Sequence, residues 1–220
     1  MDIALIERIF PFIVHAGWVT VELTVVSLLI GLAVASLLVI AKFSRYAAVR
    51  LIATAYISVM RGTPLLVQLF LVFFAGPQFG FEFTPFVAGV ITMGLNIGGY
   101  MSEGMRGAIL AVDKGQNEAA RSLGFSRVGT MRRFILPQAA PLMIRSLGVN
   151  TVILTKSTAL VSTIGVVELT YTAQRFVTST YKPFEVFALA AAAYIVIIAV
   201  ISLIIRSLEI YFSADKRAGA

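Results

Sequence analysis

The chain has 220 residues, of which 59% are hydrophobic and 13% are charged, and its mean hydropathy is +0.92. Soluble domains carry about 25% charged residues, so this composition predicts a membrane protein with several spans rather than a large soluble core. With no cysteine and one histidine, His15, the sequence offers no disulfide framework, no thiolate metal site and no histidine cluster. The first residues lack a basic region, so we expect the first apolar segment to be retained rather than cleaved.

Five segments have the roughly 20 apolar residues that a membrane-spanning helix needs. We predict an all-α protein with a single domain, residues 1–220, and spans at about 17–41, 51–76, 85–105, 141–167 and 184–205. The sequence Arg61-Gly62-Thr63-Pro64 interrupts the second span. It is typical of a helix that stops and restarts, with Thr63 as the cap and Pro64 at the first helical position.

The distribution of basic residues predicts the orientation of these spans. Twelve of the 18 lysines and arginines fall in the loop 42–50, the segment 106–137 and the C-terminal tail, all on one side of the predicted spans. The other side receives only Arg8, Arg175 and Lys182. Because cytoplasmic loops are enriched in Lys and Arg, we expect the N-terminus outside and the C-terminus in the cytoplasm.

Residues 113–136 form a polar segment in the middle of this apolar chain, and its four arginines place it in the cytoplasm. Asp113 or Asn117 can cap a helix there, and apolar residues recur near the helical period. Gly124 favours two short helices as much as one continuous helix. A basic amphipathic helix either lies on anionic lipid or docks on another protein, and physical reasoning alone leaves both open.

Charged residues inside a span are costly and therefore suggest function. Arg61 falls near the middle of the bilayer beside the interrupted helix. There the helix N-terminus and the guanidinium would suit a carboxylate. The alternative is that Arg61 pairs with a glutamate such as Glu22 and holds the spans together.

The third predicted span has two different faces. Asn96, Tyr100 and Glu103 share one face, which would line a polar path, whereas Gly94 and Gly98 belong to an opposite ridge suited to close helix packing. The alternative for Glu103 is an ion pair with Arg106. In the fourth span, Lys156 with Ser157 and Thr158 would line the path or form an interhelical salt bridge.

Four separated motifs resemble those of the permease subunits of ATP-binding cassette (ABC) importers for polar amino acids, of the histidine/glutamine type. They are EAARSLG with FILP at 118–124 and 134–137, RGTPLLVQLF at 61–70, LNIGGYMSEGMR at 95–106, and TKSTALVSTIGVVEL at 155–169. The chain departs from the family pattern at Phe134, where isoleucine is usual. It also departs at Ser157, where many members carry an acidic residue.

The resemblance implies a type I ABC importer permease fold and a set of partners. It implies a cytoplasmic coupling helix that docks on a separate ATPase subunit, with Glu118, Ala119, Ala120 and Gly124 at the contact and Leu136 and Pro137 as the rigid connection. The other expected partners are an extracytoplasmic solute-binding protein, a second permease subunit and the lipid bilayer. The expected location is the bacterial inner membrane.

The sequence contains no phosphate-binding loop, so we expect no cofactor in this chain and ATP bound by the partner ATPase. We expect no catalytic residues, no metal and no nucleic acid. The residues expected to contact solute are Arg61, Thr63, Asn96, Tyr100, Glu103, Lys156, Ser157 and Thr158. The alternatives are a permease for an opine or another small charged solute, an ATP-independent carrier, a membrane-embedded enzyme and a sensor.

Overall fold

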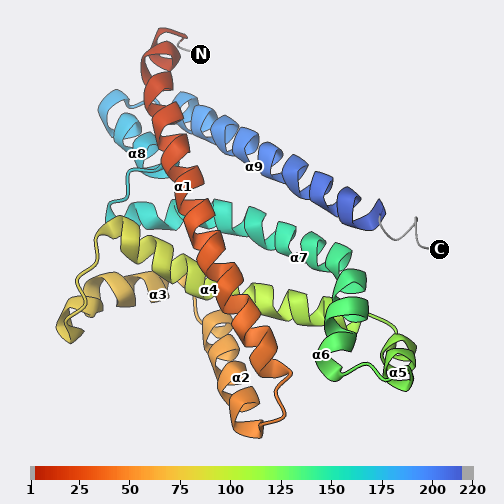
Figure 1. The fold of residues 1–220 in the computed structure, drawn as a ribbon. Coiled ribbons are helices and arrows are strands. Elements are labelled where there is room, and N and C mark those ends of the chain that lie inside the picture. Colours follow the sequence, from red (N-terminus) through yellow and green to blue (C-terminus); the bar gives the residue numbers. More distant parts are fainter. Residues whose placement is uncertain (1–2, 215–220) are drawn as a thin grey trace.

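The computed structural model describes residues 3–214, which form helices without a strand. The predicted all-α fold is therefore confirmed for this part of the chain. The predicted tail residues Lys216 and Arg217 lie outside the described residues. Helices α1 (Ile3–Lys42) and α7 (Leu136–Ser157) pack against α4 (Pro85–Leu110), and α9 (Pro183–Ala214) lies on the other side of α7 from α4 (Figure 1).

The first helix is longer than predicted. α1 extends from Ile3 to Lys42, whereas the sequence places the start of the first span at residue 17. The additional turns carry Leu5, Ile9, Ile13 and Ala16 on one face, and these side chains are buried against α8 (Leu169–Thr180) and α9 (Pro183–Ala214). The hydropathy pattern misses this segment because charged residues and Pro11 stand among its apolar residues.

Glycines allow α1 and α4 to pack closely. A Cβ atom added at Gly98 would stand 2.7 Å from Val34 Cγ1, and one at Gly94 would stand 2.7 Å from Ile30 Cβ. Since real Cβ atoms do not approach so closely, these positions have to be glycine for the two helices to touch. The predicted packing of the Gly94–Gly98 ridge is confirmed, and α4 is the helix with the largest number of buried residues.

The second predicted span is two helices and not one. α2 (Ala47–Gly62) ends at the RGTP sequence, and α3 (Leu65–Phe70) restarts after it, continuing through η1 (Leu71–Ala75) and η2 (Gly76–Phe79). The chain direction changes by 103° at the break. The predicted interruption is confirmed, and the two parts point in different directions (Figure 1).

The predicted cytoplasmic segment contains two short helices followed by a bent entry into the next long helix. α5 (Lys114–Ser122) and α6 (Arg127–Thr130) are separated by a turn, and η3 (Met131–Ile135) leads into α7 (Leu136–Ser157). η3 is a π-helical turn, in which the N–H of Leu136 donates to Met131. Because Pro137 and Pro141 lack an N–H, the regular ladder is interrupted at this entry.

The end of the predicted fourth span and the element after it differ from the sequence-based prediction. α7 ends at Ser157, and the chain continues as the 3₁₀ segment η4 (Thr158–Ile164) to a left-handed Gly165. The unexpected α8 follows, and Glu168 caps it by accepting from the N–H of Tyr171 at 2.8 Å. The other carboxylate oxygen of Glu168 accepts from Tyr194 Oη at 2.7 Å, which ties α8 to α9.

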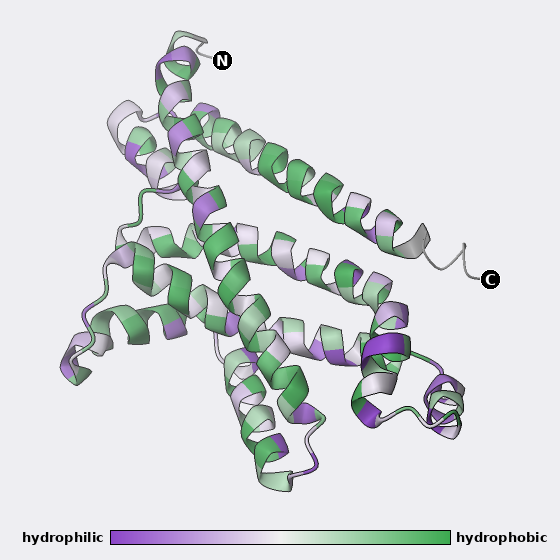
Figure 2. Cartoon of the chain, in the orientation of Figure 1, coloured by the Kyte–Doolittle hydropathy of each residue, from purple (hydrophilic) through white to green (hydrophobic). Residues whose placement is uncertain are grey.

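The helices differ in whether their length and hydropathy are sufficient to cross a membrane. Ala4–Lys42, Arg127–Ile164 and Pro183–Phe212 are long and apolar enough to cross a membrane, and the bent pair of α2 and α3 adds a fourth candidate. Figure 2 shows α9 as apolar around much of its surface, whereas α5 and α6 carry many hydrophilic residues. α4 does not reach this hydropathy, because glycines and polar residues occupy its buried faces. Five spans therefore stay a prediction.

The α1–α4 contact predicts that alanine lowers the melting temperature at one glycine of α4 and not at another. Gly98→Ala forces its methyl group against Val34 and is expected to lower the melting temperature by roughly 2–12 °C, since overpacking costs about 1–3 kcal/mol. Gly107→Ala is the matched control, because no atom lies within 4 Å of a Cβ there. Thermal unfolding of the purified chain in detergent measures both. Equal melting temperatures for Gly98→Ala and the unsubstituted protein would contradict the packing described.

Candidate functional site

The break between α2 and α3 leaves a backbone carbonyl to be satisfied. In a continuous helix the carbonyl of Met60 would accept from the N–H of residue 64, but Pro64 has no N–H. Two side-chain amides replace it. Asn96 Nδ2 donates to Met60 O at 2.8 Å, and Gln68 Nε2 donates to the same oxygen at 3.1 Å. The break is therefore held by hydrogen bonds from α4 and α3.

The two amides also bond to each other. Asn96 Nδ2 donates to Gln68 Oε1 at 3.0 Å, and Gln68 Nε2 donates to Thr63 Oγ1 at 2.6 Å. Thr63 itself donates to the carbonyl of Val59 and is the C-terminal cap residue of α2. The prediction that Thr63 caps the N-terminus of the restarted helix is wrong, because Pro64 occupies the N-cap position of α3 and Leu65 is its first residue. Gln68 was not identified from the sequence. The signal that could have identified it is a polar residue one turn after Pro64 in an otherwise apolar helix.

Asn96 has a different role from the one predicted. Its side chain is 7% exposed, and both of the hydrogen bonds that it donates end on the broken helix. We therefore assign Asn96 to positioning the bend instead of to contact with solute. Tyr56, which sequence reasoning also missed, adds a second connection between α2 and α4 by donating to the carbonyl of Leu95 at 3.0 Å.

Arg61 and Tyr100 form the exposed part of this site. The guanidinium carbon of Arg61 lies 5.4 Å from the centre of the Tyr100 ring, and Tyr100 Oη donates to the carbonyl of Arg61 at 3.4 Å. Both side chains are exposed. Arg61 forms no ion pair among residues 3–214, so the predicted alternative of a pair with Glu22 is wrong. The arginine instead faces an aromatic ring, which leaves its donors available.

Glu103 lies one helical turn beyond Tyr100 and is paired. Its carboxylate accepts from Arg106 Nη2 at 2.8 Å and from Arg106 Nε at 3.2 Å. This arrangement agrees with the alternative that the sequence offered for Glu103. The pair is partly exposed, with 24% of the glutamate side chain and 33% of the arginine side chain accessible.

The residues predicted in the fourth span stand apart from this group. Thr158 is fully buried and donates to the carbonyl of Thr155 at 2.8 Å, so we assign it to packing instead of to solute contact. Ser157 is half-buried and bonds within its own helix, to Ile153. Lys156 is exposed, with no ion pair in the described part of the chain. No contact described here joins these three residues to Arg61.

The predicted coupling segment presents an exposed helix and a buried anchor. Asp113, one of the two predicted caps, caps α5 by accepting from the N–H of Gly115 at 2.7 Å, and Gly124 ends the turn with a φ of +84°. Glu118 and Ala119 are exposed, but Ala120 is only 3% exposed, so it lies beneath the surface on which it was predicted. Leu136 and Pro137 are exposed at the start of α7.

Comparison with known proteins agrees with the resemblance seen in the sequence. A family model described as "Binding-protein-dependent transport system inner membrane component" matches residues 27–214. The chain is 40% identical to a putative glutamine transport system permease protein of Rickettsia bellii, over 90% of this chain and 91% of the relative. It is 35% identical to the nopaline transport system permease protein of Agrobacterium fabrum, over 99% of this chain and 95% of the relative.

The fold is also similar to that of a solved structure, described as the crystal structure of an amino acid ABC transporter with histidines. The two chains share 36% of their residues and a TM-score of 0.89, over 95% of this chain and 98% of the other. The predicted fold class is thereby confirmed.

Removal of the Asn96 amide is expected to weaken the bend. Asn96→Leu leaves Met60 O with one donor and Gln68 Oε1 with none, and loss of such buried partners costs about 1–3 kcal/mol. Asn150→Leu is the matched control, since Asn150 Nδ2 bonds only within its own helix, to Ser146 O. Thermal unfolding is expected to show the larger decrease for Asn96→Leu. The reverse order would contradict the role given to Asn96.

Proposed function

Because the chain belongs to the family of binding-protein-dependent transport system inner membrane components, we propose that it is the permease subunit of an ATP-driven importer for a polar amino acid. The observation that carries the substrate class is the similarity to permeases named for amino acids. It reaches 40% identity over 90% of the chain for a glutamine permease, and 36% over 95% for the solved amino acid transporter.

The exposed part of the bend is the region we propose for solute contact. Arg61 offers a cation beside Tyr100, and Thr63 adds a hydroxyl at the end of α2. Glu103, one turn along α4, is the acidic group that would approach a solute amino group if its pair with Arg106 opens. These opposite charges suit a zwitterion. Lys156 and Ser157 stay candidates for a second part of the path.

A related solute is the second candidate. The nopaline permease covers nearly the whole of this chain at 35% identity, so an opine is a candidate with a specific observation behind it. Arg61 and Glu103 at the same bend would be available to a carboxylate and to a basic group of such a solute. Transport with each solute-loaded binding protein distinguishes the two.

Coupling is proposed to occur through α5. The exposed residues Glu118 and Ala119, with Gly124 in the following turn, form a small convex surface that would enter a groove of a separate ATP-binding cassette subunit. Two copies of the permease, or this chain with a close relative, would enclose the path. An extracytoplasmic binding protein would deliver the solute to the outer side, and ATP hydrolysis would belong to the cassette subunits.

The proposed orientation places α5 and the end of α9 in the cytoplasm. The start of α2, the helices α5 and α6 and the end of α9 lie along the lower and right sides of Figure 1. The N-terminal end of α1, the helix α8 and the turn after α3 lie along the upper and left sides. The first group contains the arginine-rich segment, which supports a cytoplasmic location under the positive-inside rule.

ATPase activity of the reconstituted complex tests the proposed function. The permease is co-purified with its cassette subunits, placed in liposomes and supplied with the solute-binding protein. We expect glutamine-loaded or another amino-acid-loaded binding protein to raise ATP hydrolysis several-fold and to drive uptake of that amino acid. If no amino acid or opine does so, the proposal fails.

Ala119→Trp is the variant that tests coupling in the same experiment. A tryptophan on the exposed face of α5 would prevent close packing in a groove and should abolish the stimulation. Ala48→Trp, at an exposed position on the first turn of α2, is the matched control and should leave it intact. Gly124→Val is a poor probe, because any β-branched residue is strained at a φ of +84°.

A further inference from the structure

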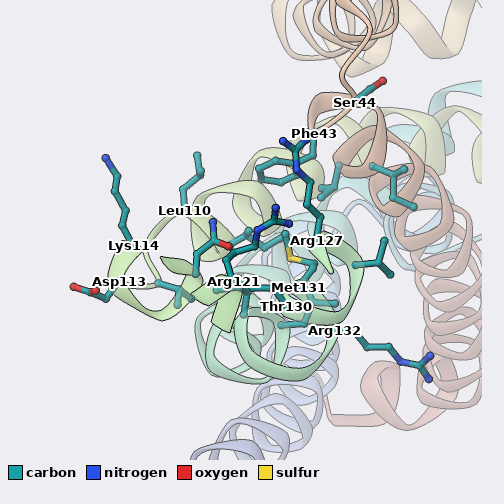
Figure 3. Close-up of a pocket in the computed structure, with 18 residues that line it drawn as sticks. Phe43, Ser44, Leu110, Asp113, Lys114, Arg121, Arg127, Thr130, Met131 and Arg132 are labelled. Atoms are coloured by element: carbon teal, nitrogen blue, oxygen red, sulfur yellow. The ribbon is translucent and has the colours of Figure 1, made fainter. Parts of the chain in front are cut away.

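A large cavity lies beside the coupling segment and is not used by the proposed mechanism. It has a volume of about 1130 Å³ and is bounded by the end of α1, the end of α4, one face of α5 and the α6–η3 segment (Figure 3). Pockets that hold drug-sized molecules have volumes of roughly 300–1,000 Å³. The cavity is therefore large enough for a lipid headgroup and the adjoining part of its acyl chains.

The walls of the cavity combine apolar and basic side chains. Ile40 and Phe43 at the end of α1, with Leu110 at the end of α4, supply an apolar wall that is continuous with the membrane-spanning helices. Arg121 and Arg127 supply guanidinium groups to the same cavity, and both extend toward Phe43 in Figure 3. Apolar side chains beside guanidinium groups fit a molecule with an acyl chain and an anionic head.

The charge of the cavity is not compensated by the described part of the chain. Neither Arg121, Arg127 nor Arg132 forms an ion pair within residues 3–214. The nearby carboxylate of Asp113 accepts the N–H of Gly115 at the start of α5. Guanidinium groups form bidentate hydrogen bonds with phosphate, so two unpaired arginines match a phosphodiester headgroup.

A buried hydroxyl gives an independent indication of a missing partner. Thr130 lines the cavity and is 2% exposed, yet its Oγ1 has no hydrogen-bond partner. Buried hydroxyl groups in native proteins are nearly always bonded. A ligand with acceptor oxygens at this end of the cavity would supply the partner after a small adjustment of the threonine.

The cavity and Ala119 of the docking surface occupy different faces of α5, and Glu118 lies between them. Lys114, Asn117 and Arg121 line the cavity, and their spacing of three and four residues places them on one face. Ala119 is two residues from both Asn117 and Arg121, which corresponds to roughly 160° around the helix. A cassette subunit on the Ala119 side would leave the cavity open to lipid.

We propose that this cavity binds one anionic phospholipid of the cytoplasmic leaflet, with its phosphate on Arg121 and Arg127 and its acyl chain along Ile40, Phe43 and Leu110. The lipid would hold the end of α1 and the coupling helices together. Lipid composition would then influence how firmly the movement of α5 is transmitted to the spans.

Lipid binding to the purified complex tests this proposal. The full chain with its cassette subunits is delipidated and titrated with phosphatidylglycerol or phosphatidylcholine, and bound lipid is measured by native mass spectrometry. We expect one phosphatidylglycerol to bind and phosphatidylcholine to bind much more weakly. Arg121→Gln with Arg127→Gln should weaken phosphatidylglycerol binding about 25-fold, about fivefold for each arginine removed.

The double variant Arg45→Gln with Arg133→Gln is the matched control. It removes the same charge from exposed arginines that do not line the cavity, and it should retain the lipid. If the first double variant does not assemble, each single replacement gives the same answer with a fivefold change. Unchanged binding in the cavity variants, or an equal loss in the control, would overturn the proposal. Loss of the cassette subunits with unchanged lipid affinity would also overturn it, because the arginines would then belong to the protein interface.

Discussion

The carbonyl oxygen of Met60 has to find a hydrogen-bond donor inside the protein. Pro64 removes the donor that a continuous helix would provide, and the hydrocarbon of a bilayer supplies no water. Asn96 from α4 and Gln68 from α3 satisfy this oxygen together. Because one donor comes from α3 and the other from α4, the direction of α3 relative to α2 is coupled to the position of α4. The position of the exposed Arg61, which follows Met60 at the end of α2, depends on the same hydrogen bonds.

The amide of Asn96 reaches this oxygen only because α4 is held deep in the bundle. Glycines at 94 and 98 bring α4 against α1 on one side, and their ridge leaves the opposite side of α4 for Asn96, Tyr100 and Glu103. The helix α4 thus packs closely on α1 through glycines on one face and carries polar side chains on the opposite face. The hydropathy of α4 is lowered by both, which explains why the helix with the largest number of buried residues does not reach the hydropathy of the candidate membrane spans.

Features that depend on local chemistry could be predicted from the sequence. The stop and restart at RGTP follows from Pro64, the cap of α5 from Asp113, and the Glu103–Arg106 pair from a spacing of three residues. The resemblance of four motifs supplied the family and the fold. Each of these inferences uses residues within a few positions of one another, or a pattern already known from relatives.

Features that depend on contacts distant in the sequence could not be predicted. The first turns of α1 are stabilised by burial against α8 and α9, and α8 is capped by Glu168, which also needs Tyr194 from α9. Asn96 has the sequence environment of a path-lining residue, and only its 36-residue-distant bond to Met60 O reveals its positioning role. The same holds for Thr158 and Ala120, whose burial is a property of packing.

Spin-label distance measurement across the break tests most directly whether these amides hold the bend. The chain has no cysteine, so labelled cysteines at the exposed positions Leu51, in α2, and Leu71, the first residue after α3, report only on the two sides of the break. Twenty residues of straight helix would separate the labelled backbone positions by about 30 Å. We expect a single distance well below this value in the intact complex, and a longer or broader distribution once Asn96 is replaced by leucine. A distance near 30 Å in the intact complex, or the same short distance with and without Asn96→Leu, would contradict the claim that these amides hold the bend.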